Sequence, residues 1–167
     1  YSTRTIGARP DVLLASPYRR ACQTADLFRC AGGCEDDIEI LFDELPEDPD
    51  GLCMLGNSAL LKTAIVNLAE NACKFSFDKK AIIRLRCLPD EIQIAIEDKG
   101  IGIQESELSY IFQPFYRSSQ TADIKGYGIG LSLVERIARM HGGTVDVKSS
   151  PNIGTTFTLV LPSNITF

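Results

Sequence analysis

The sequence predicts an α/β fold, a two-layer sandwich in which a mixed, mostly antiparallel sheet is covered on one face by about three helices. Three patterns predict this architecture. Residues 57–75 repeat apolar side chains at helical spacing, residues 81–97 alternate as a β-hairpin, and two strand patterns follow a helix near the end of the chain. Strands that come as hairpins beside helices favour this sandwich over a doubly wound parallel sheet.

The N-terminal part begins without a clear period. We expect residues 1–15 to be the remnant of a linker and residues 16–167 to form one domain. A helix is predicted from Ser16, a good N-cap with Pro17 at the first helical position, to the glycine pair at 32–33. A strand, an acidic turn and a short strand are then expected at 38–41, 45–51 and 52–55.

The central helix has the strongest pattern. Asn57 or Ser58 can cap it, and we expect it to end near Phe75. Its apolar stripe consists of Leu61, Ile65, Leu68 and Ala72. After it we expect the two strands of the hairpin, a short helix, a second long helix and two closing strands, at 81–88, 91–97, 105–112, 130–141, 144–148 and 155–161.

Length and composition fit one ordinary domain. The chain has 167 residues, of which 44% are hydrophobic, so it can bury a core of its own. A net charge of -5 argues against a nucleic-acid surface, and neither a membrane-length apolar stretch nor a charged-then-apolar leader is present. Because the chain begins with Tyr1 and ends soon after a strand pattern, we expect a cytoplasmic fragment without direct membrane contact, cut from a longer protein whose own membrane anchoring is left open.

The six cysteines are expected to be reduced and mostly packed thiols. Disulfide frameworks belong to small secreted chains with poor cores, which this composition does not resemble. Cys30 and Cys34 could bind a metal together, but the single histidine, His141, is far away in sequence and no second close pair exists, which argues against zinc. His141 itself is expected to end a helix and stabilise its C-terminal carbonyls.

Two asparagines one helical turn apart, Asn67 and Asn71, interrupt the otherwise apolar pattern of the central helix. A buried amide is unfavourable unless it forms hydrogen bonds, so these side chains need a partner. Residues at i, i+4 and i+7 share one helix face, which lets Asn67, Asn71 and Lys74 converge on one ligand. Two neutral oxygens and one ammonium group suit a magnesium-bound phosphate.

Asp98 ends a strand with the same parity as three isoleucines, so its carboxylate is expected to point inward. A carboxylate in that place needs a buried donor, and the exocyclic amine of adenine is one candidate. The alternative is an acid that caps the following turn. Gly100 and Gly102 in that turn let the backbone approach a flat ring or adopt a positive φ.

Three glycines at alternate positions, Gly126, Gly128 and Gly130, come immediately before a predicted helix. Backbone amides at a helix N-terminus bind phosphate well, and a flexible lid hinge is an alternative that can hold at the same time. The cluster is neither a P-loop nor a dinucleotide fingerprint, because no Gly-Lys-Ser/Thr follows and no hydrophobic strand precedes it. Arg117 and Lys125 place cations near these glycines, although each taken alone is typical of a surface charge.

Taken in order, five motifs resemble the N, G1, F, G2 and terminal glycine boxes of sensor histidine kinases, at 67–75, 98–102, 112–117, 126–131 and 154–156. Several spaced motifs that agree are far more specific than any one of them. The resemblance is to the ATP-binding catalytic domain of two-component kinases, within the larger group of gyrase-type topoisomerases, Hsp90 chaperones and mismatch-repair ATPases. It implies a Bergerat-type ATP-binding fold.

The resemblance also implies ATP and Mg²⁺ as ligands. Asn71 would bind Mg²⁺ through its amide oxygen, Asn67 and Lys74 would contact phosphate or its water shell, and Asp98 would bind the adenine amine. Catalytic roles would fall to Asn67, Lys74 and Arg117. The other nucleotide contacts implied are Gly100, Gly102, Ile103, Phe112, Lys125, Gly126, Gly128, Gly130, Leu131 and Thr156.

Asn67 distinguishes two branches of that larger group. Relatives that hydrolyse ATP, such as gyrase and Hsp90, look to have a glutamate at the matching place, where a carboxylate can activate water and an amide cannot. The sequence therefore favours phosphoryl transfer to a protein histidine. An ATPase module of the gyrase or Hsp90 type and a non-catalytic nucleotide-sensing domain are the alternatives.

The phosphoacceptor histidine of the family lies on a separate two-helix dimerisation domain, and no histidine precedes His141 in this chain. We therefore expect the fragment to bind ATP but not to autophosphorylate alone. The partners implied are the histidine-bearing dimerisation domain of the same parent protein and a response regulator, with a monomeric fragment in a dimeric parent.

Residues 10–25 also resemble a piece of the histidine phosphatase family, with its Ser-Pro and Arg-Ala-x-Gln-Thr-Ala pattern. The Arg-His-Gly catalytic motif of that family is absent upstream. We therefore interpret this second likeness as chance.

Overall fold

The computed structural model describes residues 11–12, 38–44, 55–88, 90–118, 121 and 126–163. The helix predicted at 16–33 and the acidic turn at 45–51 lie outside the described residues, and so does the phosphatase-like stretch at 10–25 apart from Asp11 and Val12. The short strand expected at 52–55 is described only at its end, where β3 (Leu55–Gly56) pairs antiparallel with β1 (Asp11–Val12).

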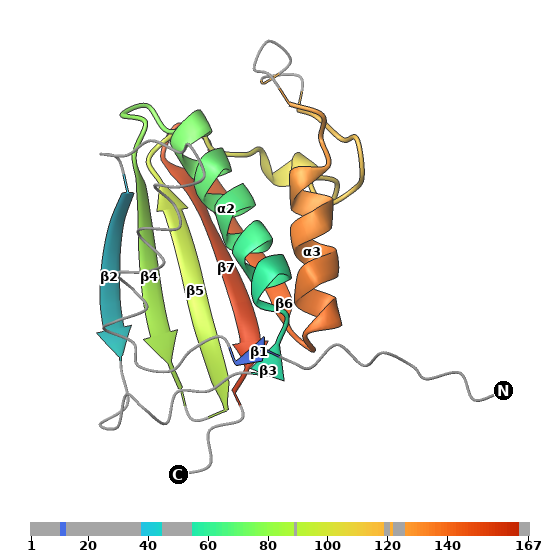
Figure 1. The fold of residues 1–167 in the computed structure, drawn as a ribbon. Coiled ribbons are helices and arrows are strands. Elements are labelled where there is room, and N and C mark those ends of the chain that lie inside the picture. Colours follow the sequence, from blue (N-terminus) through green and yellow to red (C-terminus); the bar gives the residue numbers. More distant parts are fainter. Residues whose placement is uncertain are drawn as a thin grey trace, which may run out of the picture.

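A five-stranded sheet forms one layer of the described fold (Figure 1). In spatial order its strands are β2 (Ile38–Glu44), β4 (Ala81–Cys87), β5 (Glu91–Asp98), β7 (Gly154–Pro162) and β6 (Thr144–Ser150). β2 runs parallel to β4, and the other three neighbouring pairs are antiparallel. The prediction of a mixed, mostly antiparallel sheet is therefore confirmed.

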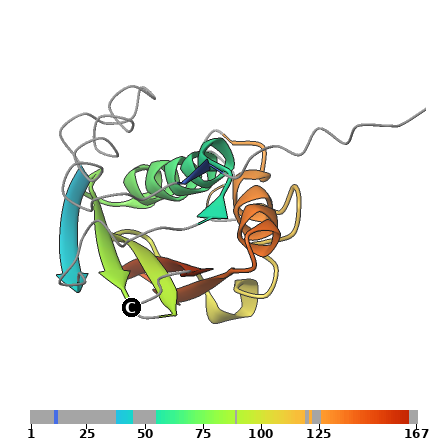
Figure 2. The same cartoon turned by 60° about the horizontal axis from the view of Figure 1, so that its bottom comes forward.

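Two helices, α2 (Ser58–Phe75) and α3 (Gly130–Met140), form the other layer. They pack against each other, and Figure 2 shows both on the same face of the sheet. The prediction of about three helices is not met in the described residues. The segment predicted as a helix at 105–112 forms only a 3₁₀ turn, η2 (Glu105–Glu107), followed by further turns. A short helix has little room to propagate there, because Pro114 disfavours helical geometry in the residue before it.

The core explains how α2 is placed on the sheet. The Asn57 side chain caps the helix by accepting a hydrogen bond from the Leu60 amide at 3.1 Å. The stripe residues Leu61, Leu68 and Ala72 are buried, while Ile65 is partly buried at the edge of the core. They pack over alternate side chains of the strands, namely Ile92, Ile94, Ile96, Phe157, Leu159 and Leu161.

Both ends of the helical layer are fixed. At one end, His141 caps α3, its Nδ1 lies 2.7 Å from the Ile137 carbonyl, and its Nε2 accepts the Asn57 amide at 3.0 Å. The predicted helix-ending role of His141 is confirmed, and the same ring joins α3 to α2. At the other end, a bridge between Ser76 and Gly100 joins the end of α2 to the end of β5. No helix in the described part of the chain has the length and hydrophobicity that crossing a membrane requires.

Candidate functional site

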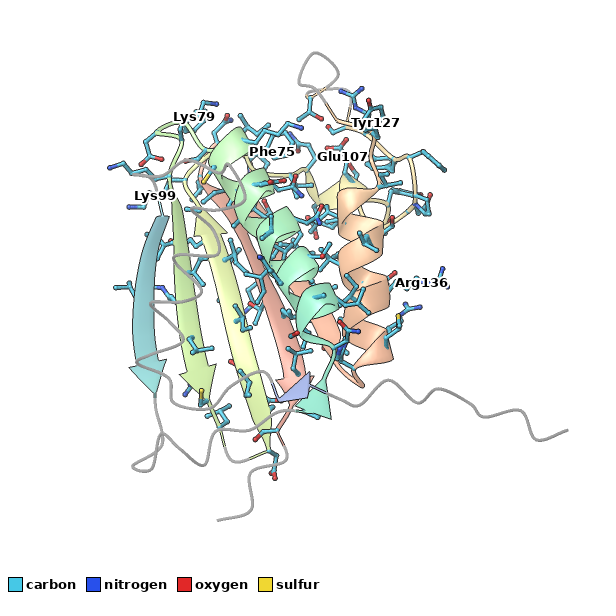
Figure 3. The ribbon with its side chains drawn as sticks, viewed as in Figure 1. Phe75, Lys79, Lys99, Glu107, Tyr127 and Arg136 are labelled. Atoms are coloured by element: carbon cyan, nitrogen blue, oxygen red, sulfur yellow. The ribbon has the colours of Figure 1, made fainter. Side chains whose placement is uncertain are left out.

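A cavity of about 480 Å³ opens between α2, the adjoining ends of β5 and β7, and the loops on either side of η2 and before α3. The structure brings most of the predicted site residues to it: Asn67, Asn71, Lys74, Asp98, Gly102, Ile103, Arg117, Gly126, Gly128, Gly130 and Leu131. In Figure 3, Glu107 lies between the end of α2, marked by Phe75, and the loop that carries Tyr127. Motifs separated by more than 50 residues in sequence thus share one cavity.

Asp98 points inward, as the strand parity predicted. Its side chain is 6% exposed, and its Oδ1 atom is buried without a hydrogen-bond partner. Burial raises the pKa of the Asp98 carboxyl to about 6, although backbone hydrogen bonds from Thr155 and Gly100 favour the charged form. A buried acceptor without a donor is unfavourable, so this oxygen is suited to a ligand that carries an N–H group.

The glycines after Asp98 serve close packing of the backbone. A Cβ on Gly100 would lie 2.0 Å from the Phe75 carbonyl oxygen, and one on Gly102 would lie 2.1 Å from the Ser150 carbonyl oxygen. Gly102 also has a φ of 65°. The predicted roles were a positive φ and close approach of the backbone to a flat ring. The structure shows the positive φ at Gly102, and both glycines pack closely against protein backbone.

The asparagine face of α2 is turned toward the start of α3. Asn67 Nδ2 donates to the Thr63 carbonyl at 2.8 Å, which fixes the orientation of the amide. A Cβ on Gly130 would lie 2.9 Å from Asn67 Oδ1 and 3.9 Å from Asn71 Nδ2. The absence of a side chain at Gly130 therefore keeps space open beside both amides and the unpaired amides of the α3 N-terminus.

Two cations carried by different parts of the chain line the same cavity. Lys74 comes from the last turn of α2, and its Nζ atom also lies 5.0 Å from the centre of the Phe75 ring. Burial lowers the pKa of the Lys74 ammonium group, and the positive charge of Arg117 lowers it further, while Glu70 opposes both. Arg117 Nη2 donates to the Thr121 carbonyl at 3.0 Å. Two positive charges thus reach the cavity of a chain whose net charge is -5, next to the carboxylates of Glu70 and Glu107.

Three predicted residues do not line the cavity. Gly100 packs against Phe75, and Phe112 packs edge-on against Phe157 with ring centres 6.4 Å apart. Thr156 is the third, and its neighbour Thr155 lines the cavity instead. Thr155 is opposite Asp98 in the β5–β7 pair and shares its buried face, whereas Thr156 is opposite Glu97 and faces the other side of the sheet. Lys125 lies outside the described residues.

Sequence reasoning also missed several residues of the cavity wall. Thr155 could have been found from strand parity once β7 was paired with β5. The Tyr116 hydroxyl donates to Glu107 Oε1 at 3.0 Å, and both residues line the cavity. Glu70, one position before Asn71, lines it as well. Helical spacing could have found Glu70, three residues after Asn67, whereas no spacing rule signals the Tyr116–Glu107 contact, which depends on how the turns of residues 108–118 fold.

The donor set limits what metal the site could hold. Among the described residues, no group of three His, Cys, Asp or Glu side chains could hold a metal ion. An amide oxygen such as that of Asn71, with phosphate oxygens and water, is the kind of ligand set that Mg²⁺ accepts. Cys73 and Cys87, the cysteines within the described residues, are buried, as predicted for packed thiols, and burial raises the pKa of Cys87 to about 11.

Comparison with known families agrees with this geometry. The sequence model of the family described as "Histidine kinase-, DNA gyrase B-, and HSP90-like ATPase" matches residues 56–165, which include every described residue of the cavity. This chain belongs to that family. Membership implies ATP binding, and the relatives described next identify the chain as the catalytic ATP-binding domain of a sensor histidine kinase.

Individual relatives place the chain more closely within the family. Sensor-like histidine kinase SenX3 of Mycobacterium tuberculosis is 38% identical over 132 residues, which cover 77% of this chain and 31% of SenX3. Sensor protein RprX of Bacteroides fragilis is 36% identical over 107 residues, covering 61% of this chain and 21% of RprX. The chain therefore spans less than a third of the length of either relative.

Solved structures show the same fold. The mycobacterial sensor histidine kinase MprB matches with a TM-score of 0.72 and 26% sequence identity, over 94% of this chain and 99% of the MprB chain. Full-length ShkA in complex with AMPPNP matches with a TM-score of 0.71 and 21% identity, over 97% of this chain and 33% of ShkA. At that identity, the second likeness concerns the fold alone.

Proposed function

We propose that this chain binds ATP with Mg²⁺ in the cavity and donates the γ-phosphoryl group to a histidine on a separate dimerisation domain of its parent protein. Phosphoryl transfer needs positioned charges more than covalent help from the protein. The cavity supplies neutral amides, two cations and bare backbone amides, which suit that requirement. The proposal also includes a response regulator as a further partner of the parent protein. It places this domain in the cytoplasm, within a dimeric parent that is either anchored to a membrane or free.

In this proposal the site has two ends. Asp98 binds the adenine amine at the sheet end, where the Thr155 amide also donates toward its carboxylate. Asn71 binds Mg²⁺, and Asn67, Lys74, Arg117 and the glycine loop contact the phosphates. When bound at Asn71, Mg²⁺ would neutralise phosphate charge.

The observation that carries the proposal is the unpaired Asp98 Oδ1 atom at the buried end of a cavity that also contains two cations. An adenine amine satisfies the acceptor, and a triphosphate satisfies the cations. The backbone hydrogen bonds from Thr155 and Gly100 to the Asp98 carboxylate leave Oδ1 as a buried acceptor without a donor beside the cavity.

Titration calorimetry with Mg²⁺ and a non-hydrolysable ATP analogue tests binding. We expect binding by the unmodified chain, and a loss of about tenfold in ATP affinity for Asp98→Asn with weaker discrimination against the GTP analogue, because the new amide can donate to a guanine carbonyl. Asp146→Asn, on an exposed position of β6, is the matched control and should bind like the parent. No binding at millimolar ligand would refute the nucleotide site.

The acceptor is tested separately, with γ-labelled ATP and a supplied helical domain that carries a histidine. We expect label on the supplied domain and none on the chain alone, whose single histidine, His141, caps α3 at the end opposite Gly130. Label that appears only as free phosphate would refute transfer.

Hydrolysis is the second candidate because Glu70 and Glu107 place carboxylates in the cavity wall even though position 67 is an amide. A carboxylate near the phosphates could activate water. Steady phosphate release that Glu70→Gln abolishes, without loss of nucleotide affinity, would favour this candidate over transfer.

A further inference from the structure

The segment that brings Arg117 to the cavity is built from turns alone. It follows η2, and its backbone is joined by bonds such as Gln113 N to Tyr110 O at 2.9 Å and Tyr116 N to Gln113 O at 3.2 Å. Ile111 is its one buried side chain among the described residues 108–118, with Leu108, Phe112 and Tyr116 partly buried against the core. Segments with so few buried anchors open locally at low free energy, so the position of Arg117 depends on additional contacts.

One side-chain contact closes this segment on itself. The Tyr116 hydroxyl, next to Arg117, donates to Glu107 Oε1 at 3.0 Å, and Glu107 is the last residue of η2. The Tyr116 ring also stacks on Tyr110, with ring centres 6.0 Å apart and planes inclined by 27°. The hydrogen bond therefore ties the end of the segment to its beginning, and both bonded side chains lie in the cavity wall.

The hydroxyl group is suited to a lasting donor role. Burial raises the pKa of Tyr116, and the hydrogen bond and negative charge of Glu107 raise it further. The phenol therefore keeps its proton at neutral pH. A hydroxyl that donates to a carboxylate forms one of the stronger hydrogen bonds in proteins.

A tether is needed because the two cations of the cavity repel each other. The effect of Arg117 on the pKa of Lys74 shows that the charges are close enough to interact. Lys74 is fixed by α2, so repulsion acts mainly on the turn segment that carries Arg117. Before an anion binds, the hydrogen bond from Arg117 to the Thr121 carbonyl and the contacts that hold its segment oppose this repulsion.

We propose that Tyr116 is a positioning residue whose hydroxyl, held by Glu107, keeps Arg117 facing Lys74 and so sets the preference of the site for a nucleoside triphosphate over a diphosphate. The inference rests on the proposed nucleotide site and adds to it. Tyr116 does not touch the reacting atoms in this account. It acts through Arg117, and the terminal phosphate is the group expected to need both cations.

The test compares two ligands on the same variants by calorimetry with Mg²⁺, a non-hydrolysable ATP analogue and ADP. Tyr116→Phe removes the hydroxyl but keeps the stacked ring. It should reduce the affinity for the ATP analogue about tenfold, while the affinity for ADP changes less than about twofold. Arg117→Ala should lose the same preference for the ATP analogue over ADP. The double variant, with both Tyr116→Phe and Arg117→Ala, should lose no more of this preference than Arg117→Ala alone, because Tyr116 acts through Arg117.

Two further variants separate positioning from general stability. Glu107→Gln keeps an acceptor oxygen for the hydroxyl and should retain most of the preference, whereas Glu107→Ala should lose it. Tyr110→Phe is the matched control, since it removes a hydroxyl from the other ring of the stack and should leave both affinities unchanged. The inference would be overturned if Tyr116→Phe reduced the affinity for both ligands equally, or reduced neither. Failure of the unmodified chain to bind either nucleotide would instead overturn the proposed function and the inference with it.

Discussion

Asp98 shows how one buried carboxylate can serve a ligand at the expense of the folded state. Its Oδ1 atom has no partner, and its pKa of about 6 lies above the ordinary value of 3.8. An amide at this position would be easier to bury, but it would present a donor as well as an acceptor. A site that must accept an N–H group and reject a carbonyl group gains selectivity from the carboxylate, and stability is reduced in exchange.

This cost predicts a pH dependence of folding. The folded protein holds the Asp98 proton more tightly than the unfolded chain does, so this proton adds to the unfolding free energy. That contribution is complete below pH about 4 and is lost as the pH rises through about 6. The gap between the two pKa values corresponds to about 3 kcal/mol at most. The unfolding free energy of the parent minus that of Asp98→Asn should therefore fall by up to about 3 kcal/mol between pH 4 and pH 7 in urea titrations. Parallel pH curves for the two proteins would contradict the buried, partnerless carboxylate.

A hydroxyl group supports the same pocket from outside. Ser149 Oγ accepts the Ile103 amide at 2.8 Å, lies 2.9 Å from Thr155 Oγ1, and donates toward the Gly154 carbonyl at 3.0 Å. One side chain of β6 thus joins the loop after Asp98 to the beginning of β7. No sequence pattern indicated this role, because it depends on the β6–β7 register.

Sequence reasoning succeeded for residues whose roles are local and failed where two strands had to be aligned. The inward aim of Asp98 follows from parity within one strand, and convergence of Asn67, Asn71 and Lys74 follows from one helix. Thr156 lies on the face of the sheet away from the cavity, because a single step of register moves a side chain to the opposite face. The Tyr116–Glu107 contact depends on turn geometry, which has no periodic signal.

At the scale of elements, the long periodic segments were predicted well. The observed α2 begins and ends where its cap and apolar stripe placed it, and the hairpin strands β4 and β5 agree with prediction within one residue at each end. The short helix at 105–112 was wrong, since a brief segment leaves tertiary contacts to decide its conformation. Phe115, at the end of those turns, donates to the Gly128 carbonyl at 2.8 Å with a φ of 66°, which no helix could accommodate.

The joint between α2 and α3 gives a prediction at this scale. His141 satisfies the Asn57 amide and the Ile137 carbonyl together only as the neutral Nδ1–H tautomer, because the first group donates and the second accepts. Its ring also fills the space beside Gly56, where a Cβ would lie 2.8 Å from His141 Cδ2. We expect His141→Ala to reduce the unfolding free energy by about 2 kcal/mol, measured from the urea midpoint at unchanged m-value.

Arg139→Ala is the matched control for that measurement. Arg139 lies on the same turn of α3 and pairs with Glu135 at 2.8 Å, but both side chains are solvent-accessible. Such surface pairs contribute little, so its loss should cost less than about 1 kcal/mol. Nucleotide affinity should survive both changes, because His141 lies at the end of α3 away from Gly130. If Arg139→Ala reduced the unfolding free energy as much as His141→Ala, the hydrogen bonds of His141 between α2 and α3 would not explain the loss of stability.

At the scale of the whole molecule, the strand order was the part that the sequence could not supply. The order β2-β4-β5-β7-β6 places the last strand inside the sheet and the preceding one at its edge. Hydrophobic alternation identifies strands but not their neighbours when the partners are far apart in sequence. That order is also what builds the site, because it places Asp98 and Thr155 opposite each other at the end of the sheet beside the C-terminal turns of α2.

A cavity walled by both layers predicts that a bound nucleotide stabilises the entire described fold. The wall combines α2, β5, β7 and the loop before α3, so a ligand that contacts all of them loses its site when the layers separate. At a ligand concentration of a hundred times Kd, linkage gives about 3 kcal/mol of additional unfolding free energy.

Thermal unfolding with Mg²⁺ and the ATP analogue should show this increase, and a chelator should remove most of it, because the proposed metal contact joins Asn71 to the phosphates. The chelator alone should leave the unliganded protein unchanged, since the described residues contain no cluster of three metal-binding side chains that folding could depend on. An increase confined to local protection of the loop, without a shift of global unfolding, would mean that the ligand binds one layer only and would contradict a site shared by helix and sheet.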